Sequence, residues 1–396
     1  MRNPLATVRE LRGPLAVLAS MLFVSQLGVG VMLPIIPLYA ISLGASPREL
    51  GLLTTVFSLA NVVAQLGVGF LLDRIDPRVP IRAGIATYAG ANVLLSTATA
   101  VPSLLLFRGL AGLGGGANIV ADRVYLSRVA EPARLAYLNG VLASAASAGG
   151  LMGPAIGGLL AQVADLRAPF LVVGLTSGIA FLASLRLPAA PRAPAAAAGA
   201  VAISAVSRSV VVLLVANTLL TATFGGFITT FAPYATAAFG WSIAEVGVVF
   251  SVYAAGSIAL AAPLGALADR RGRRLVGTFA TVPVFLFVLA LVFALPKAVI
   301  YGSAFFAGAG LAAFGAAWFA LLTEASPEAR RGRTFGIVSA ISTLGLVVGA
   351  NGAAALWEAT DIRLALLGTG IAALLGGLTL ALLPAQRRAL VAGREP

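Results

Sequence analysis

Long stretches without a charged residue are the feature that most restricts how this chain can fold. Each is long enough for the roughly 20 residues that an α-helix needs to cross a bilayer. Only 10% of the 396 residues are charged, against about 25% in an average soluble domain. Because hydrocarbon offers no water to backbone polar groups, the stretches must form helices, whereas a membrane β-barrel would show short alternating segments. We count twelve expected spans, two of which overlap near a helix break at residue 100: 15–33, 50–72, 83–107, 102–121, 135–161, 168–185, 209–239, 246–268, 275–296, 298–323, 334–357 and 364–386.

The net charge of +13 is distributed unevenly. If the N-terminus is cytoplasmic, 22 of the 27 cationic side chains fall on one side, in the two terminal segments and in every second loop. This excess follows the positive-inside rule. The sequence therefore predicts a multi-pass membrane protein with both termini in the cytoplasm. The composition, with one lysine against 26 arginines, is typical of a bacterial source and so indicates the bacterial cytoplasmic (inner) membrane. Nucleic-acid binding is not needed to explain the charge.

Catalysis and cofactor chemistry find no support in the sequence. The chain has no cysteine and no histidine, which excludes disulfides and Cys/His metal sites. The glycine-rich run at 112–116 lies within an apolar span, so it is not a phosphate-binding loop. We expect no enzymatic activity, no catalytic residue, no metal and no cofactor. The apolar run after the basic start continues past 15 residues and predicts an uncleaved first helix.

The chain repeats itself at an offset of 196 residues. GFLLDRIDPR at 69–78 aligns without gaps on GALADRRGRR at 265–274. The same shift aligns further glycines, prolines and charged residues: Pro37 with Pro233, Glu49 with Glu245, Gly51 with Gly247, Arg134 with Arg330, Gly149 with Gly345 and Gly153 with Gly349. A fixed shift of this kind indicates duplication of a structural unit.

The duplication predicts an all-α membrane protein with twelve transmembrane helices in two six-helix bundles. We expect the N-terminal bundle over 1–186 and the C-terminal bundle over 208–396. The alanine- and proline-rich segment 187–207 between them is expected to be a cytoplasmic linker. Two parallel repeats suit a transporter that alternates access by rocking one bundle against the other.

A loop motif that occurs twice resembles the major facilitator superfamily, and the resemblance extends over essentially the whole chain. The motif is Gly-x-Leu-x-Asp-Arg followed by basic residues, read at Gly69, Leu71, Asp73 and Arg74 and again at Gly265, Leu267, Asp269 and Arg270. The resemblance implies the major facilitator fold and a latch that favours the outward-facing state. We place Asp73, Arg74, Arg78, Asp269 and Arg270 in that latch. The first copy departs from the pattern at Asp76-Pro77.

Arg108 opens a second motif, RGLAGLGGG, which resembles the family pattern of an arginine followed by spaced glycines. A charge inside a membrane helix is costly and normally functional. Its repeat counterpart is Ala304, so the fold itself does not require the charge. Two interpretations stay open: Arg108 tunes protonation or holds an anionic group, or it bonds carbonyls of a neighbouring helix.

Asp122 lies 14 residues further along the same expected helix, roughly 21 Å away at 1.5 Å per residue. We expect it to pair with Arg74 or Arg78 and to relay a change of charge to the latch. An ordinary ion pair at the membrane border is an equal alternative. Because the middles of most other spans contain no carboxylate, Asp122 acting with Asp73 is our candidate for proton coupling.

The stretch NGVLASAASAGGLMGPAIGGLL at 139–160 resembles the signature of the antiporter branch, drug–proton antiporters above all. Its spaced residues are Gly140, Gly149, Gly153, Pro154, Gly157 and Gly158. At 100° per residue, most of these glycines form a smooth stripe that allows close helix contact, and Pro154 can bend the helix. Generic packing of small residues would also explain the stripe, but not the complete spacing.

We expect a substrate cavity between the bundles. The candidate lining residues are amides and aromatics near mid-membrane: Gln26, Asn61, Gln65, Asn118, Asn217, Phe224, Phe227, Tyr253, Phe314, Trp318 and Asn351. Few polar groups among aromatic ones favour an apolar or amphipathic compound, cations included. About half of the amides are expected to join helices instead.

The sequence thus favours a monomeric secondary transporter that exports small amphipathic or lipophilic compounds in exchange for protons. Its expected partners are that small molecule, protons and the lipid bilayer. One alternative is a facilitator or symporter of a small metabolite such as a sugar or organic anion. Another is a receptor or scaffold with a transporter fold. The absence of a carboxylate from the first span is the main evidence against antiport.

Overall fold

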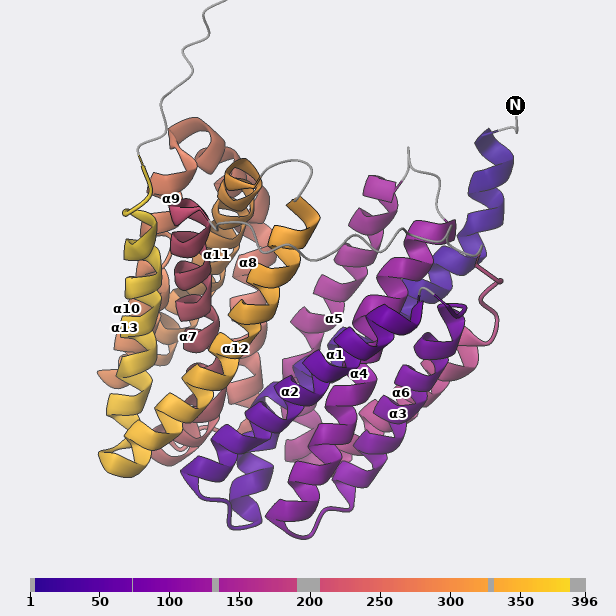
Figure 1. Cartoon of the computed structure of the whole chain (residues 1–396). Helices are drawn as coiled ribbons and strands as arrows, with labels where there is room; N and C mark the ends of the chain where they lie inside the picture. Colours follow the sequence, from indigo (N-terminus) through magenta and orange to yellow (C-terminus); the bar gives the residue numbers. More distant parts are fainter. Residues whose placement is uncertain (1–3, 73, 130–134, 191–206, 327–330, 385–396) are drawn as a thin grey trace, which may run out of the picture.

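The computed structural model describes residues 4–72, 74–129, 135–190, 207–326 and 331–384. This part of the chain is helical and contains no strand (Figure 1). The first half contains α1 (Pro4–Ser42), α2 (Pro47–Leu72), α3 (Arg78–Ser96), α4 (Val101–Val129), α5 (Leu135–Val163) and α6 (Ala168–Ser184). The second half contains α7 (Arg208–Phe239), α8 (Ile243–Arg271), α9 (Arg273–Phe279), α10 (Val282–Val292), α11 (Lys297–Ala325), α12 (Arg331–Ala359) and α13 (Ile362–Leu380).

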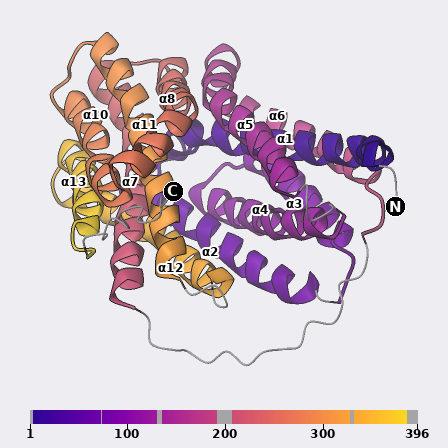
Figure 2. The ribbon, with the colours of Figure 1, turned by 90° about the horizontal axis from the view of Figure 1, so that it is seen from above.

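Helices α1–α6 form one bundle and α7–α13 form a second beside it (Figures 1 and 2). In the first bundle α1 packs along α5, α2 along α4, and α3 along α6. In the second, α7 packs along α12, α8 along α11, and α10 along α13. The short helices α9 and α10 occupy the place of α3, because the 196-residue shift carries 78–96 onto 274–292. The expected duplicated, all-helical architecture is confirmed.

Nine helical segments of the described part are long and apolar enough to cross a membrane, with α9 and α10 counted as one segment. Helices α3, α6 and α12 complete the bundles around them. The number of twelve crossings stays a prediction, as do the bundle boundaries. Most of the expected linker lies outside the described residues.

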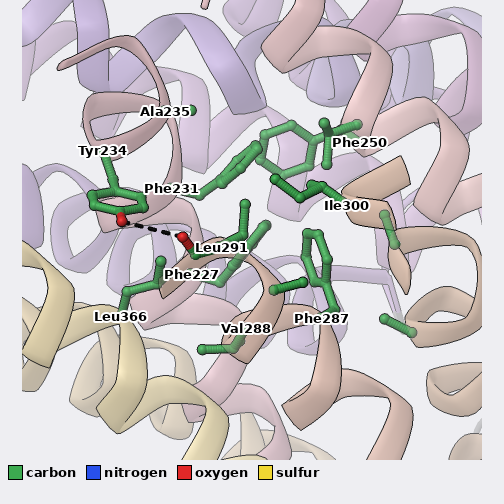
Figure 3. Close-up of a cluster of buried hydrophobic side chains, with 14 of the residues drawn as sticks. Phe227, Phe231, Tyr234, Ala235, Phe250, Phe287, Val288, Leu291, Ile300 and Leu366 are labelled. Carbon is green, nitrogen blue, oxygen red and sulfur yellow. Dashed lines mark hydrogen bonds between the residues drawn. The ribbon is translucent and has the colours of Figure 1, made fainter. Parts of the chain in front are cut away.

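An aromatic cluster forms the centre of the second bundle (Figure 3). Phe227 and Phe231 of α7 stack at 4.7 Å between ring centroids, and both contact Phe250 of α8 edge-on. Such ring pairs add to the stabilisation that apolar burial already gives. Nearby, the Tyr234 hydroxyl donates to the carbonyl of Leu291 at 3.2 Å, which ties α7 to α10.

Helix α4 is held by close backbone contacts on two sides. A Cβ on Gly112 or Gly116 would collide with the carbonyl oxygens of Phe57 and Asn61 in α2. On the other side, a Cβ at Gly114 would lie 2.6 Å from the backbone of α3. Glycine is needed at these positions because neighbouring helices approach to backbone distance. The glycine motif after Arg108 therefore packs α4 between α2 and α3.

The two bundles contact each other at the end of the molecule opposite to the N-terminus. The contacting residues lie in the first turns of α2 and α8 and in the later turns of α5 and α12. Toward the end where α1 begins, the helices of the two bundles diverge (Figure 1). Two seams carry most of the contact, α5 against α8 and α2 against α12 (Figure 2), and α1 adds contacts with α7.

Candidate functional site

A cavity lies between the two bundles and is lined by residues from both. Its empty space, counted together with the open solvent at its mouth, is about 670 Å³. The first bundle contributes mainly α1 and α2 together with Arg108 of α4, and the second contributes residues of α7 and α12. The lining is Val29, Met32, Leu33, Ile36, Pro37, Leu50, Leu53, Thr54, Phe57, Arg108, Phe224, Ile228, Thr229 and Leu346. A largely apolar hollow with a few polar groups is the usual form of a small-molecule site.

Arg108 is the charged residue in this lining. Its guanidinium carbon lies 4.0 Å above the ring centroid of Phe57, a cation–π contact within the bundle. The Nε atom is buried and has no hydrogen-bond partner among the described residues. The sequence singled out Arg108, but nothing in the sequence pointed to Phe57 as the residue that positions it.

Three of the predicted lining residues face this region. Phe224 lines the cavity directly. Gln26 is exposed and lies three and seven residues before Val29 and Leu33, hence on the same face of α1. Asn217 is half-buried, seven residues before Phe224 on α7. Gln26 and Asn217 therefore lie on the helix faces that line the cavity, each within two turns of a lining residue.

Other predicted lining residues join helices instead. The Asn61 amide donates to the carbonyl of Gly112 at 3.3 Å, and Gln65 donates to Asn61 Oδ1 at 2.6 Å. The Trp318 indole donates to the carbonyl of Leu213 at 2.8 Å. Buried polar groups need such partners, so these side chains fasten α2 to α4 and α11 to α7. They do not line the cavity between the bundles.

Phe227 and Tyr253 line a second hollow of about 480 Å³ inside the C-terminal bundle. Phe224 lines this hollow as well as the cavity between the bundles. Phe314 is fully buried in a separate core cluster of the same bundle. The aromatics were expected in one cavity, whereas the structure distributes them over three environments.

Asp122 and Asn118 lie in a third, smaller hollow within the N-terminal bundle, between α1, α3, α4 and α6. Each side chain is 7% exposed, and Asp122 Oδ1 and Asn118 Oδ1 have no hydrogen-bond partner among the described residues. Asn118 was expected to face the substrate cavity, and it faces Gly84 of α3 instead. The two residues are one helical turn apart and therefore share this face of α4.

The expected pairing of Asp122 with Arg78 is not formed. Arg78 pairs with Asp76 at 2.8 Å and also donates to the carbonyl of Leu187. Burial raises the pKa of Asp76, but the hydrogen bonds and charge of Arg78 outweigh it and hold the pKa below its ordinary value. Asp76 stands where this copy departs from the motif, and its carboxylate is the one that pairs with Arg78. Arg74 is exposed, and Asp73 lies outside the described residues.

The second copy of the latch motif forms an ion-pair network at the same end of the C-terminal bundle. Arg273 pairs with Asp269 at 2.7 Å and with Glu324 of α11. Arg270 beside it is exposed. Arg128 of α4 makes a related contact in the first bundle, donating to the carbonyl of Leu72 at 2.6 Å. Cations are favourable at helix C-termini such as that of α2.

The glycine stripe of α5 packs against α1. A Cβ on Gly149, Gly153 or Gly157 would approach the backbone of α1 to within 2.6 Å. The predicted use of these glycines is therefore correct in its geometry. Gly140 has open space around it, so its place in the motif is not explained by packing.

Pro154 and Gly158 mark the seam between α5 and α8. A Cβ on Gly247 would collide with the Pro154 carbonyl oxygen, and a Cβ on Gly158 would lie 2.6 Å from the Ile243 carbonyl oxygen. Two helices of different bundles thus meet here at backbone distance. Ser251 of α8 reinforces the contact with its hydroxyl group.

The Ser251 hydroxyl bridges two backbone groups of α5. It donates to the carbonyl of Leu151 at 2.7 Å and accepts from the N–H of Ala155 at 3.2 Å. Residues 151 and 155 are the pair that a regular α-helix joins directly. The Ser251 side chain of the second bundle therefore bonds both the backbone N–H and the backbone carbonyl of one i to i−4 pair of α5, next to Pro154.

The seam between α2 and α12 depends on side chains. The Asn351 amide donates to Thr55 Oγ1 at 2.6 Å, and Arg48 pairs with Glu358 at 3.6 Å. Asn351 was predicted to bind substrate, but its amide donates to Thr55 and to the carbonyl of Val347 in its own helix. Ser251 and Thr55 are themselves 196 residues apart. A comparison of the polar residues at equivalent positions of the two repeats would have identified Ser251 and Thr55 from the sequence.

Comparisons with known proteins agree with this architecture. A family model described as Major Facilitator Superfamily matches residues 18–234 and again 213–395. An uncharacterized MFS-type transporter of Methanocaldococcus jannaschii is 32% identical over 162 residues. The quinolone resistance protein NorA of Staphylococcus aureus is 26% identical over 166 residues. Each match spans 42% of the relative's length and 41–42% of this chain.

Solved structures share the fold at low sequence identity. The nucleoside transporter NupG superposes with a TM-score of 0.80 at 14% identity, covering 93% of this chain and 98% of its own. A bacterial homolog of the human lysosomal transporter Spinster, in an inward-facing and unoccupied conformation, gives a TM-score of 0.78 at 14% identity. It covers 92% of this chain and 95% of its own.

Proposed function

The chain belongs to the Major Facilitator Superfamily, and we propose that it exports small amphipathic or lipophilic compounds by alternating access, in exchange for protons. The observation that carries the proposal is the apolar cavity walled by both bundles, whose described residues contact each other near one end of the molecule. Rocking about that contact exposes such a cavity to each side in turn. The partial similarity to the quinolone resistance protein NorA adds support for efflux.

We place the protein in a bacterial cytoplasmic membrane with both termini in the cytoplasm, following the charge distribution. In that orientation the bundles close the outer end of the cavity and diverge toward the cytoplasm. The state is then inward-facing, ready to take up a compound from the cytoplasm or the inner leaflet.

Asp122 is the proposed proton carrier. It is a carboxylate buried within a membrane helix, and such residues often mark proton relays. Its hollow also contains Asn118, Tyr88 and Ser177. The proton site is therefore separate from the substrate cavity, and the two are proposed to communicate through movement of the N-terminal bundle.

Reconstitution with an imposed pH gradient tests the proposal. We expect purified protein in liposomes to accumulate amphipathic dyes against their gradient while protons flow the other way, recorded with an internal pH indicator. Asp122→Asn should abolish gradient-driven accumulation and leave exchange of labelled for unlabelled dye intact. Asp165→Asn is the matched control, because Asp165 lies in a loop where an amide oxygen can still cap α6.

Two outcomes would overturn parts of the proposal. Unchanged gradient-driven transport in Asp122→Asn would exclude this residue as the carrier. Equal transport with and without a pH gradient would favour a facilitator instead. That second reading draws on one observation: among the described residues, no carboxylate lines the cavity between the bundles.

A further inference from the structure

We propose that the cavity between the bundles binds amphipathic organic anions, with the acidic head group on Arg108 and the apolar body toward Phe224. The inference rests on the proposed function, because it names the substrate class of the same transport site.

The charge balance of the cavity carries the first step. Arg108 contributes a positive charge, and no carboxylate of the described chain shares this lining. Asp122 on the same helix lies 14 residues away, roughly 21 Å along the axis, in a different hollow. An unpaired charge in an apolar membrane cavity is unfavourable. An anionic ligand would neutralise it, whereas a lipophilic cation would be repelled.

The geometry of the guanidinium supports an oxyanion partner. The guanidinium carbon lies 4.0 Å from the Phe57 ring centroid, and this cation–π contact restrains the position of the group. Nε is buried without a partner, which leaves this edge donor available. Carboxylates and sulfonates present two oxygens that match the planar fork of arginine. The Phe57 contact thus holds the Arg108 head group in the cavity wall, with its Nε donor still without a partner.

The opposite wall is suited to an apolar body. Phe224, Ile228 and Leu346 of the C-terminal bundle line the same cavity as Arg108. Phe224 also lines the aromatic hollow that contains Phe227 and Tyr253. A ligand whose head lies on Arg108 can therefore place an aromatic tail against the C-terminal bundle. Charge recognition belongs to one bundle and apolar contact to the other.

Binding of three compounds with the same ring system tests this assignment. The protein in lipid nanodiscs is titrated calorimetrically with 2-naphthalenesulfonate, 2-naphthylmethylammonium and 2-naphthalenemethanol, and heats from empty nanodiscs are subtracted. We expect the sulfonate to bind at least about tenfold more tightly than either other probe, as a charge-assisted bond in an apolar site provides. Equal or tighter binding of the ammonium probe overturns the inference, as does absence of sulfonate binding.

Variants assign the preference to Arg108. Arg108→Gln should weaken sulfonate binding about 10- to 100-fold and leave the neutral probe unchanged, which also shows that the cavity is intact. Arg108→Lys should retain part of the preference, since it keeps the charge but not the fork. Phe224→Ala should weaken all three probes alike. Arg123→Gln, an exposed position on the same helix, is the control and should change nothing.

An equal loss for all three probes in Arg108→Gln would assign the arginine to structure and overturn the inference. The readout needs no pH gradient, so it is independent of the transport test. Sulfonate binding without proton-driven export would refute the proposed function alone. Export of dyes without any preference for the sulfonate would refute this inference alone.

Discussion

The α5–α8 seam and the α2–α12 seam occupy equivalent places in the two repeats, yet they are built differently. Gly247 faces Pro154 in the first, and their counterparts Gly51 and Ala350 face each other in the second. In the first, a Cβ on the glycine would collide with backbone. In the second, it would lie 3.0 Å from Asn351 Oδ1 and 3.3 Å from the Ala350 carbonyl oxygen.

The hydroxyl contacts repeat the same difference. Ser251 accepts from a backbone N–H at residue 155, and its counterpart Thr55 accepts from the side chain of Asn351, the counterpart of that residue. In the first seam a serine side chain bonds the main chain of α5 where the backbones touch, whereas in the second seam the bond joins two side chains. Backbone atoms in direct contact allow one arrangement of the two helices, whereas side chains can change their hydrogen-bond partners. We infer that α5–α8 is the rigid pivot between the bundles and that α2–α12 is the adaptable side.

The largest effect is expected from filling the tight seam. Gly247→Val places a branched side chain against the Pro154 carbonyl, so the closed end must separate, and transport should fall by at least about tenfold. Gly51→Val is the counterpart and should cost less. Double electron–electron resonance between spin labels at Ser127→Cys and Ala266→Cys reports the other end, since the chain has no cysteine of its own. A larger distance change in Gly51→Val than in Gly247→Val would reverse the comparison.

Removing the proline from α5, or introducing one at the equivalent position of α12, should have the next largest effect. Pro154→Ala restores an N–H inside α5 and removes the clash of the ring with the preceding turn, which can stabilise a helix by up to about 3 kcal/mol. We expect a higher melting temperature and slower transport. Ala350→Pro should lower the melting temperature, because Ala350 is fully buried inside α12, where a proline ring removes a helical hydrogen bond and clashes with the preceding turn. Equal shifts of the same sign in both variants would contradict the asymmetry.

Removal of the bridging hydroxyl should have a moderate effect. Ser251→Ala loses a bond worth about 0.5–1.5 kcal/mol, so the balance between open and closed ends should shift up to about tenfold. Hydrogen exchange followed by mass spectrometry should show faster exchange around Ala155. Thr55→Val should act less, because Asn351 keeps its bond to the carbonyl of Val347 at 2.8 Å. Equal exchange rates in wild type and Ser251→Ala would show that the Ala155 N–H stays bonded to the Leu151 carbonyl without Ser251.

The smallest effect is expected at the rim of the adaptable seam. The Arg48 side chain is 78% exposed in its pair with Glu358, and exposed pairs contribute about 0–1 kcal/mol. Arg48→Gln should change the label distances and the transport rate by less than about twofold. The difference from wild type should vanish at 1 M salt, where charges are screened beyond about 3 Å. A persistent effect at high salt would assign Arg48 a packing role.

Sequence reasoning was strongest where one residue type has one physical use. The glycines at 149, 153 and 157 could be assigned to a helix contact because nothing else fits there. The duplication likewise predicted two helical bundles of the same kind. It was weakest for amides and carboxylates, because the partners of Asn61, Asn118 and Asn351 depend on how each helix is rotated against its neighbours. Asp76 shows the same limit: only the folded loop reveals that it, and not Asp122, pairs with Arg78.

The close embedding of α4 has a consequence for energy coupling. A ligand on Arg108 and the charge on Asp122 would interact across roughly 21 Å with only about 0.8 kcal/mol at an effective dielectric of 20. That is less than the 1.4 kcal/mol of a tenfold linkage between two binding events. Glycines 112, 114 and 116 leave α4 no room to slide past α2 or α3. Helix α4 therefore cannot move along its axis by itself. A change at Arg108 or at Asp122 has to be transmitted to the other residue by a movement of the whole N-terminal bundle.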